Sequence, residues 1–381
     1  MGAVLRIENI GQIKKADIRF GDLTVFVGPQ ATGKSIALQL LKLLVDTGYV
    51  QSELRQYGID WDGRIDDFFD VYFGEGMRAL WQEGTSRIAW EGKVVKMRAL
   101  LGRQEPRKGE SLFYVPAQRV LTLPDGWPRR FTDFSAGDPY VVRQFSERLR
   151  RLMDEGEFAG TGQVFPPKYR RRHMYRDLLN ETIFQDFTLR IDKHLSQKRL
   201  VLSQRGGNGG LPFMVWSAGQ REFIPLLLAF YCLMPPLDIR WGKWVVIEEP
   251  EMGLHTRAIS TVLLMTLGLL ERGYKVCIST HSPYVLDIVW ALNVLKRHQA
   301  PIDLVREMFD APKERQINEI AKSALTKDTK VYYFDRESGA AKDISNLDPG
   351  ATDEVEAGWG GLSEFSGRVA DVVAKAVAKG E

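Results

Sequence analysis

One eight-residue segment has the spacing of a phosphate-binding loop: Gly28-Pro29-Gln30-Ala31-Thr32-Gly33-Lys34-Ser35. The glycines at positions 28 and 33 free consecutive backbone N–H groups to curl round phosphate oxygens at the start of a helix. In such a loop Lys34 reaches the β and γ phosphates, and Ser35 offers its hydroxyl to Mg²⁺. The segment from Gly28 to Ile36 is therefore predicted to bind ATP together with Mg²⁺.

Two acids and a histidine follow apolar runs further along the chain. Glu248 and Glu249 come directly after Trp244-Val245-Val246-Ile247, and His281 lies within Ser279-Thr280-His281-Ser282-Pro283. The first acid suits the Mg²⁺ shell, and the second suits orientation or deprotonation of an attacking water. The imidazole is placed to hydrogen-bond a γ-phosphate. The predicted catalytic residues are Lys34, Glu249 and His281, and the predicted metal ligands here are Ser35 and Glu248.

A second loop, Ser217-Ala218-Gly219-Gln220, precedes another apolar helix. The Ser217 hydroxyl and the Gly219 amide lie ahead of a helix, so this helix N-terminus is a second candidate anion-binding site. Ser217 also suits a simple N-cap, which leaves a purely structural role open. The loop lies about 30 residues before the acid pair, and this position favours nucleotide contact through Ser217, Gly219 and Gln220.

These residues must be positioned by alternating strands and helices. Residues 4 to 27 alternate in hydrophobicity and then become fully apolar, which predicts a hairpin followed by a buried strand that ends at Gly28. Further predicted strands are 111–116, 244–247 and 275–279, and predicted helices are 35–45, 217–231 and 256–272. Strand, helix and strand at this spacing form a parallel crossover, so the polar strand ends gather at one edge of a sheet.

The same patterns predict the domain organisation of an α/β protein. The predicted parts are a core of 1–50 and 213–300, an insertion of 51–139 with a strand near 111–118, a basic helical lobe of 140–212, and an extension of 301–381 with a hairpin and a helix over 369–378.

Composition excludes few functions. Of 381 residues, 44% are hydrophobic and 27% charged, and a net charge of +3 is too small to indicate nucleic-acid binding. Cys232 and Cys277 each stand alone in an apolar stretch, which predicts reduced core residues and neither a zinc site nor a disulfide. The longest apolar run is shorter than the roughly 20 residues of a membrane span and contains prolines. Without a signal peptide at the start, we expect a soluble, cytoplasmic protein.

Taken together, residues 4–45 and 213–290 resemble the head of an ABC-type ATPase, close to the OLD (overcoming lysogenization defect), RecF and SMC proteins. The resemblance implies a P-loop NTPase fold with a mixed central sheet, an N-terminal β-hairpin subdomain and a helical lobe. It implies that Gln118 is a Q-loop residue that contacts nucleotide and metal, and that residues 251–255 form a D-loop at a dimer face. It also implies that the loop from Ser217 to Gln220 is pressed onto the ATP of a neighbouring head, so ATP gates a dimer or higher homo-oligomer.

Two features depart from these families. ABC heads usually carry Asp-Glu where this sequence has Glu248-Glu249, and full-length OLD proteins continue into a Toprim nuclease domain for which no signature follows His281. We therefore expect the effector to be a separate protein, such as a Toprim or HNH nuclease. ATPases of this kind resemble the ATPase components of bacterial antiphage systems, of which PARIS is preferred and Septu is the alternative. A phage protein or DNA would then be the trigger.

Three other functions remain open at this stage. Arg170, Arg171 and Arg172, with Lys168, Tyr169 and Tyr175, offer a surface for DNA, as in a RecF-like repair ATPase that clamps a duplex. A nucleotide-dependent scaffold with little turnover is a second alternative. A transporter subunit fits poorly, because the loop at Ser217 is not Leu-Ser-Gly-Gly-Gln and the segment between the P-loop and Gln118 is long.

Overall fold

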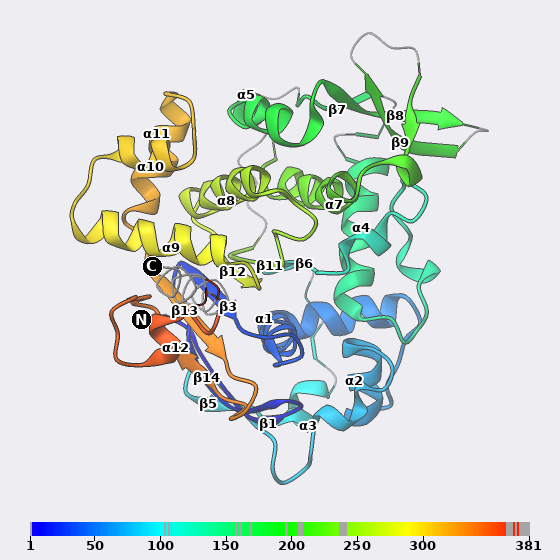
Figure 1. The fold of residues 1–381 in the computed structure, drawn as a ribbon. Coiled ribbons are helices and arrows are strands. Elements are labelled where there is room, and N and C mark those ends of the chain that lie inside the picture. Colours follow the sequence, from blue (N-terminus) through cyan, green and yellow to red (C-terminus); the bar gives the residue numbers. More distant parts are fainter. Residues whose placement is uncertain are drawn as a thin grey trace.

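The computed structural model describes residues 2–102, 104, 105, 107, 109–156, 158, 159, 162–167, 170–194, 197–204, 209–235, 242–362, 369 and 372, without the side chains of 170 and 171. A six-stranded sheet lies at its centre (Figure 1). Its strands are β3 (Leu23–Val27), β6 (Leu112–Val115), β11 (Trp244–Glu248), β12 (Lys275–Thr280), β13 (Thr329–Phe334) and β14 (Ala341–Asp343). The order is β14-β13-β3-β12-β11-β6, in which β14 is antiparallel and the other five strands are parallel. The predicted α/β fold with a mixed central sheet is confirmed.

Successive residues of the central strands face opposite sides of the sheet, so each strand serves two cores. On β11, Val245 and Ile247 belong to one hydrophobic cluster, whereas Trp244 and Val246 belong to the other. Figure 1 shows the helices that complete these cores on the two faces. One face is covered by α7 (Ala218–Leu233), α8 (Thr256–Glu271) and α9 (Pro283–Arg297), and the other by α1 (Lys34–Gln56).

The N-terminal hairpin belongs to a second sheet, of order β2-β1-β4-β5, that packs into the same core as α1. Its strands are β1 (Val4–Ile10), β2 (Ile13–Arg19), β4 (Arg87–Trp90) and β5 (Lys93–Val94). The short helices that follow α1 and precede α4 (Tyr140–Asp154) in the chain are α2 (Ile65–Phe73), α3 (Met97–Leu101) and the 3-10 turns η1 (Met77–Leu80), η2 (Arg119–Thr122) and η3 (Phe131–Asp133). The predicted hairpin and the buried strand after it are confirmed.

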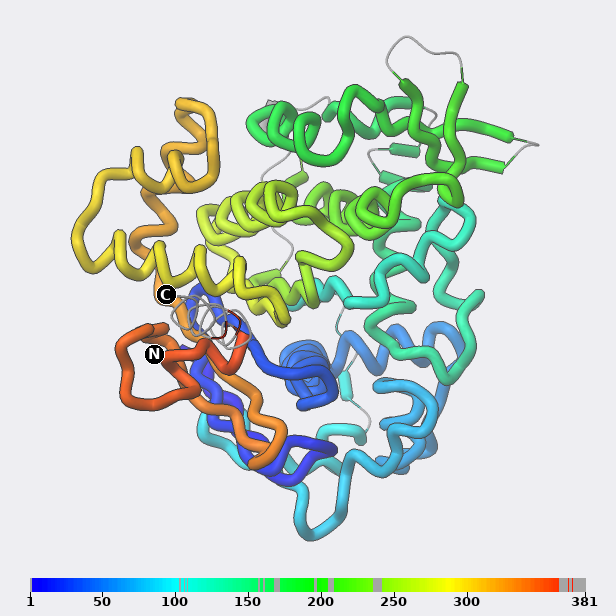
Figure 2. The backbone as a smooth tube through the Cα atoms, in the orientation of Figure 1, coloured from blue at the N-terminus to red at the C-terminus, as the bar shows by residue number. Residues whose placement is uncertain are grey.

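The lobe expected to be helical contains a third sheet, so that part of the expectation is wrong. After α4 (Tyr140–Asp154) the chain forms a sheet of order β10-β9-β8-β7 (Figure 2). Strand β8 does carry a period-two pattern, in which the charged Arg190 and Asp192 alternate with the buried Leu189 and Ile191, and the prediction of a helical lobe overlooked it. The lobe elements are β7 (Gly162–Phe165), β8 (Phe187–His194), β9 (Gln197–Gln204), β10 (Leu211–Pro212), α5 (Arg170–His173), α6 (Arg176–Leu179), the π-helix η4 (Asn180–Phe184) and the 3-10 turn η5 (Phe213–Val215).

The C-terminal part returns to the central sheet. The predicted hairpin is confirmed as β13 and β14, which pair antiparallel. The remaining helices described here are α10 (Ile302–Met308), α11 (Arg315–Ala324) and α12 (Glu354–Ala357). The helix predicted over 369–378 falls outside the described residues except at positions 369 and 372. In the described part of the chain, no helix has the length and apolar character needed to cross a membrane.

The helix after the P-loop is longer than predicted and is fastened to β6 by buried charges. It bends at Asp46, whose φ and ψ are −123° and 24°. The Asp46 carboxylate accepts hydrogen bonds from the backbone N–H of Ser111 (2.8 Å) and Leu112 (2.9 Å), and from Lys42 Nζ (2.8 Å). Lys42 is fully buried and also donates to Glu110 (2.6 Å). This cluster fixes the distance between α1 and the strand that leads to Gln118.

Replacing Lys42 with methionine is expected to lower the free energy of unfolding by about 3 to 5 kcal/mol, because it leaves the buried Asp46 carboxylate without its cation. Urea unfolding at neutral pH measures the loss. Lys322→Met, at an exposed position of α11, is the matched control. A loss no larger than that of the control would contradict the structural role of the cluster.

Candidate functional site

The P-loop connects the end of β3 to the first turn of α1, and its glycines have backbone angles that suit few other residues. Gly28 has φ 142° and Gly33 has φ 95°. A Cβ atom on Gly28 would lie 2.5 Å from the carbonyl oxygen of Phe334, and one on Gly33 would lie 2.5 Å from the side chain of Ile13. Residues of the neighbouring strands therefore lie too close to both positions for a side chain to fit.

Lys34 is buried inside this loop. Its Nζ donates hydrogen bonds to the carbonyl oxygens of Gly28 (2.8 Å) and Pro29 (2.6 Å). Burial lowers the pKa of Lys34 to about 8, although the acids Glu249, Glu248 and Glu251 pull the pKa upward. The ammonium group thus hydrogen-bonds to the loop backbone. The charged oxygens of a bound polyphosphate would be stronger hydrogen-bond acceptors for it.

This lowered pKa predicts a pH dependence of nucleotide binding. Phosphate charges beside Lys34 would raise its pKa, so binding above about pH 8 takes up a proton and the affinity falls as pH rises, by up to about tenfold per pH unit. Below about pH 7.5, where Lys34 is already charged in the free protein, the affinity should be nearly constant. Calorimetric titrations with a non-hydrolysable ATP analogue between about pH 7 and 9.5, in buffers of different ionisation enthalpy, measure the affinity and the proton uptake. A flat affinity over this range would contradict the assignment.

Glu248 ends β11 in the interior, beside the P-loop serine. Burial raises the pKa of Glu248, and the adjacent Ser35 hydroxyl and the Ala117 amide oppose this rise. Its Oε2 accepts a hydrogen bond from Ala117 N–H (3.2 Å), whereas its buried Oε1 has no hydrogen-bond partner among the described residues. An unpartnered carboxylate oxygen beside a serine hydroxyl fits Mg²⁺, which takes oxygen ligands. The described residues contain no group of three or more His, Cys, Asp or Glu that could hold a metal, so phosphate oxygens would have to complete the shell.

Glu249 adopts a backbone conformation that is rare for its residue type. Its φ is 44°, and its N–H donates to the carbonyl oxygen of Ser279 on β12 (2.8 Å). Such strain is characteristic of functional sites. The Glu249 Oε1 lies 3.4 Å from His281 Nε2, and hydrogen bonding to His281 holds the pKa of Glu249 below its usual value. Glu249 is therefore a carboxylate at neutral pH and can accept a proton.

His281 is held from its other side by Glu251, and this support was missed in the sequence. Glu251 Oε1 accepts hydrogen bonds from the His281 backbone N–H (2.9 Å) and from Thr280 Oγ1 (2.7 Å). The sequence suggested Glu251 only as the start of a dimer-facing loop. The contact spans 30 positions of the chain, and no local pattern marks it.

One pocket of about 280 Å³ brings most of the predicted site together. It is lined by Gln30 to Ile36, Glu249, Ser279 and His281, and by Gln12 from the turn between β1 and β2, which the sequence did not single out. One strand, β12, separates β3 from β11, so the P-loop strand and the acid strand lie about 10 Å apart.

The second predicted loop lies away from this pocket. Ser217 is the N-cap of α7, where its Oγ accepts from Gln220 N–H (3.2 Å) and its own N–H donates to Gln220 Oε1 (3.1 Å). None of Ser217, Gly219 and Gln220 lines the pocket, and Ser217 is exposed. Gln118 is also exposed and does not line the pocket, so its contact with nucleotide and metal stays a prediction.

Arg119 is a site residue that sequence reasoning missed. It is fully buried, and its guanidinium donates to the carbonyl oxygens of Glu248 (3.0 Å), Glu249 (3.0 Å) and Glu222 (3.1 Å). It therefore joins the acid pair to the first turns of α7. In the sequence it is one arginine of many, and its position directly after Gln118 was the only available signal.

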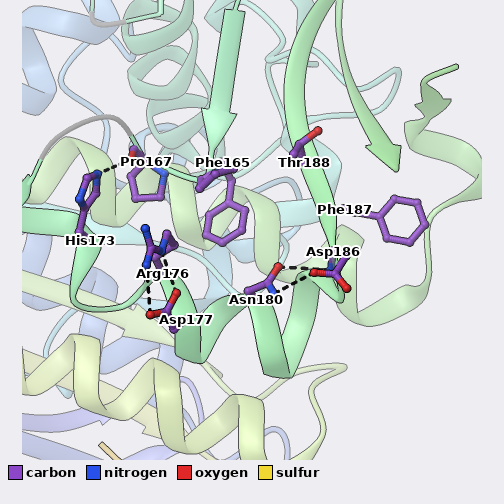
Figure 3. Close-up of a pocket in the computed structure, with 10 residues that line it drawn as sticks. Phe165, Pro167, His173, Arg176, Asp177, Asn180, Asp186, Phe187 and Thr188 are labelled. Atoms are coloured by element: carbon purple, nitrogen blue, oxygen red, sulfur yellow. Dashed lines mark hydrogen bonds and ion pairs between the residues drawn. The ribbon is translucent and has the colours of Figure 1, made fainter. Parts of the chain in front are cut away.

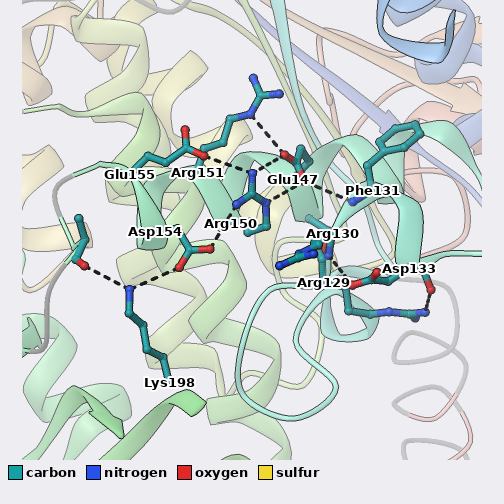
Figure 4. A network of polar contacts seen from close by, with 12 residues as sticks. Arg129, Arg130, Phe131, Asp133, Glu147, Arg150, Arg151, Asp154, Glu155 and Lys198 are labelled. Carbon is teal, nitrogen blue, oxygen red and sulfur yellow. Dashed lines mark hydrogen bonds and ion pairs between the residues drawn. The ribbon is translucent and has the colours of Figure 1, made fainter. Parts of the chain in front are cut away.

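The arginines of the lobe bind acids and carbonyls of the same chain. On α4, Arg150 pairs with Glu147 (2.8 Å), Asp154 and Glu155 (Figure 4). Arg148 pairs with Glu110 (2.9 Å), and Arg172 is buried and donates to backbone carbonyls at the end of α7. Lys168 and Tyr169 and the side chains of Arg170 and Arg171 lie outside the described residues.

A second pocket, of about 370 Å³, lies in the lobe between β8 and the short helices (Figure 3). Its polar side chains bond within the chain: Arg176 pairs with Asp177 (2.8 Å), and Asn180 Nδ2 donates to Asp186 (3.3 Å). His173 Nε2 lies 2.8 Å from the carbonyl oxygen of Pro167.

The central sheet, the P-loop at the end of β3 and the acidic end of β11 define the fold of a P-loop NTPase of the ABC-ATPase type. The parallel strands place the P-loop, the acid pair and His281 at one edge of the sheet, as the sequence predicted.

Known proteins are similar to parts of this chain. The family described as "AAA domain, putative AbiEii toxin, Type IV TA system" matches residues 128–287, which include Ser217, the acid pair and His281 but not the P-loop. The Old nuclease of Escherichia phage P2 is 28% identical over 163 residues, which are 41% of this chain and 26% of that protein. The matched segment thus spans about a quarter of the length of this relative.

Solved structures of related shape are more distant. The SMC head bound to the C-terminal winged-helix domain of ScpA has a TM-score of 0.38 at 14% identity and covers 74% of this chain and 90% of its own. CbiO1 of Clostridium perfringens, part of an ABC transporter complex, has a TM-score of 0.35 at 11% identity (90% and 88% covered). The SMC head domain of Thermotoga maritima has a TM-score of 0.33 at 12% identity (75% and 92% covered).

Proposed function

We propose that this protein binds and hydrolyses ATP, and that two heads close over two shared ATP molecules to control a separate effector protein. The single observation that carries the proposal is the pocket in which Lys34, Ser35, Glu249 and His281 meet, with the unpartnered oxygen of Glu248 behind it. These groups supply a phosphate cradle, a place for Mg²⁺ and a base.

The chemistry follows from their positions. The P-loop amides and Lys34 hold the β and γ phosphates, and Ser35 and Glu248 would hold Mg²⁺, which neutralises charge on these phosphates when bound. Glu249 accepts a proton from water as the water oxygen bonds to the γ-phosphorus and the bond to the β–γ bridging oxygen breaks. ADP and inorganic phosphate are the products. His281 orients Glu249 and lies where its imidazole can contact the γ-phosphate.

Dimer formation would complete the site. The loop at Ser217 is exposed and lies outside the pocket of its own head, so it is free to contact a nucleotide held by another. Large apolar side chains are exposed within three positions of Gln118, Ser217 or His281. They are Leu121 (58% exposed), Met214 (68%), Val215 (61%) and Tyr284 (49%). A surface that carries such residues beside the site loops fits an interface that forms when ATP is bound.

The proposed biological role is control of an antiphage effector. It is supported by similarity to a protein named Old nuclease and to a family described as a putative toxin, both from partial matches. The effector in this proposal is a separate nuclease of the Toprim or HNH type, and the trigger is a phage protein or DNA. A RecF-like DNA clamp is less favoured, because Arg172, one of the three arginines on which that alternative rests, is buried and donates to backbone carbonyls.

Phosphate release and particle mass test the proposal directly. With ATP and Mg²⁺ we expect steady phosphate release, and light scattering should report an increase from monomer to dimer mass that ADP does not produce. Turnover without a change in mass would contradict the shared site. A change in mass without turnover would instead favour the scaffold alternative.

A further inference from the structure

Arg119 forms hydrogen bonds to two parts of the head, and these parts serve different ATP sites in the proposed dimer. One part is the first turns of α7, which carry Ser217 and Gly219 toward the ATP of the other head. The other part is the end of β11, which carries Glu248 and Glu249 into the head's own ATP site. The Arg119 guanidinium donates to a carbonyl oxygen in the first part, that of Glu222 (3.1 Å), and to two in the second.

Burial of the Arg119 guanidinium costs free energy unless its hydrogen bonds are kept. It is fully buried, and burial lowers its pKa even though Glu222, Glu251, Glu249 and Glu248 pull the pKa upward. Its nearest carboxylate is that of Glu222, at 3.7 Å, so its best-aligned partners are backbone carbonyls. A displacement of any one of these carbonyls therefore favours a compensating movement of the others.

The hydrogen-bond ladder of α7 is interrupted after its first turns. Pro225 lies inside the helix and has no N–H to donate to the carbonyl oxygen of Arg221, so the hydrogen-bond ladder is interrupted there. Gly219 packs closely against the loop after β11, since a Cβ on Gly219 would lie 2.9 Å from the carbonyl oxygen of Gly253. Movement of this turn thus acts on the segment that contains Glu251, which holds His281.

Glu249 is the residue on which such a movement would have most effect. Its φ of 44° places it in a region that is unfavourable for glutamate, so its carboxylate depends on external restraint. Two of these restraints are the Arg119 bond to its carbonyl oxygen (3.0 Å) and the bond from its N–H to Ser279 (2.8 Å).

We infer that Arg119 is a positioning residue that couples the Ser217 loop of each head to the Glu249 of the same head, so that the two ATP sites hydrolyse cooperatively. The inference rests on the proposed dimer with shared sites. When the loop of one head engages the ATP of the other, the first turns of α7 shift, and Arg119 passes that shift to Glu249. Each head is then fully competent for hydrolysis only when its partner's site is filled.

A mixing experiment measures the coupling without altering Arg119. Wild-type heads are mixed in rising proportion with Lys34→Ala heads, whose own sites stay empty, at an ATP concentration that fills the wild-type sites, and phosphate release is recorded. Independent sites predict activity that falls in proportion to the wild-type fraction, whereas coupled sites predict a fall close to its square. The Hill coefficient for ATP should lie between 1 and 2, the number of sites. A linear mixing curve would overturn the inference while leaving the proposed ATPase intact, and an absence of all wild-type turnover would overturn the proposed function itself.

Variants then assign the coupling to this residue. Arg119→Lys keeps the charge but cannot hold three carbonyls in the fork geometry of a guanidinium, so its mixing curve should become linear and its Hill coefficient should fall to about 1. Because Arg119 does not line the pocket, nucleotide affinity should stay within about twofold.

Pro225→Ala is the second variant, to be used if the arginine variant does not fold. It restores a helix N–H and stiffens the first turns, so it should also make the mixing curve more linear and lower the Hill coefficient. Coupling that persists in Pro225→Ala, or in a folded Arg119→Lys, would overturn the inference.

Discussion

Replacing Lys34 with alanine is expected to lower ATP hydrolysis by at least about 100-fold and to weaken ATP binding. Loss of one preorganised group that stabilises transition-state charge costs about 10² to 10³ in rate. Lys34 is buried in the P-loop with its Nζ against the carbonyl oxygens of Gly28 and Pro29, so its charge can be delivered to phosphates only a short movement away. Phosphate release at saturating ATP and Mg²⁺ gives the rate, and titration with a fluorescent ATP analogue gives the affinity.

Two comparisons make this test specific. Lys15→Ala removes an exposed lysine of β2 and should leave rate and affinity unchanged. Circular dichroism should show the same fold for both variants. Turnover of Lys34→Ala within about fivefold of wild type would exclude the P-loop as the hydrolytic site, since any positioned charge is worth more.

The centre of the site could be predicted because its signals are local. Gly28, Gly33 and Lys34 lie within one turn, and Glu248, Glu249 and His281 follow short apolar strands that must be parallel. Once the strands are parallel, their carboxyl ends meet at one edge whatever the rest of the chain does. The structure adds the distances that this argument lacks, such as 3.4 Å between Glu249 and His281.

The supports of the site could not be predicted, because they join residues far apart in sequence. Arg119 bonds a carbonyl oxygen 129 positions later, and Asp46 binds backbone N–H groups 65 and 66 positions later. Nothing in a window of ten or fifteen residues distinguishes Arg119 from an exposed arginine. Such contacts depend on which elements the fold brings together, and this information is distributed over the chain.

In the lobe, ion pairs inside the chain account for part of the basic signal. Arg150 and Arg151 pair with Glu147 of the same helix, at the three- and four-residue spacings that a sequence displays. Arg148 pairs with Glu110, and no local pattern marks that contact. Charge counts along a chain therefore overstate surface charge wherever acids from another element, here the segment before β6, lie opposite. The physical consequence is an ion pair between Arg148 and Glu110 that joins α4 to the segment before β6.

Replacing Glu249 with glutamine is expected to lower ATP turnover by about 10² to 10⁴, the usual contribution of a positioned base, while ATP binding persists. Glutamine keeps the size of the side chain and can still hydrogen-bond His281, but it cannot accept the proton of the attacking water. With binding intact and hydrolysis blocked, ATP should remain in the shared sites, and the dimer that wild type forms only transiently should become stable. Light scattering with ATP and Mg²⁺ reports the mass, and phosphate release reports the rate.

Glu271→Gln, at the exposed end of α8, is the matched control and should behave as wild type. A monomeric Glu249→Gln protein that still binds ATP would separate hydrolysis from assembly, and then the exposed loop at Ser217 would need another partner.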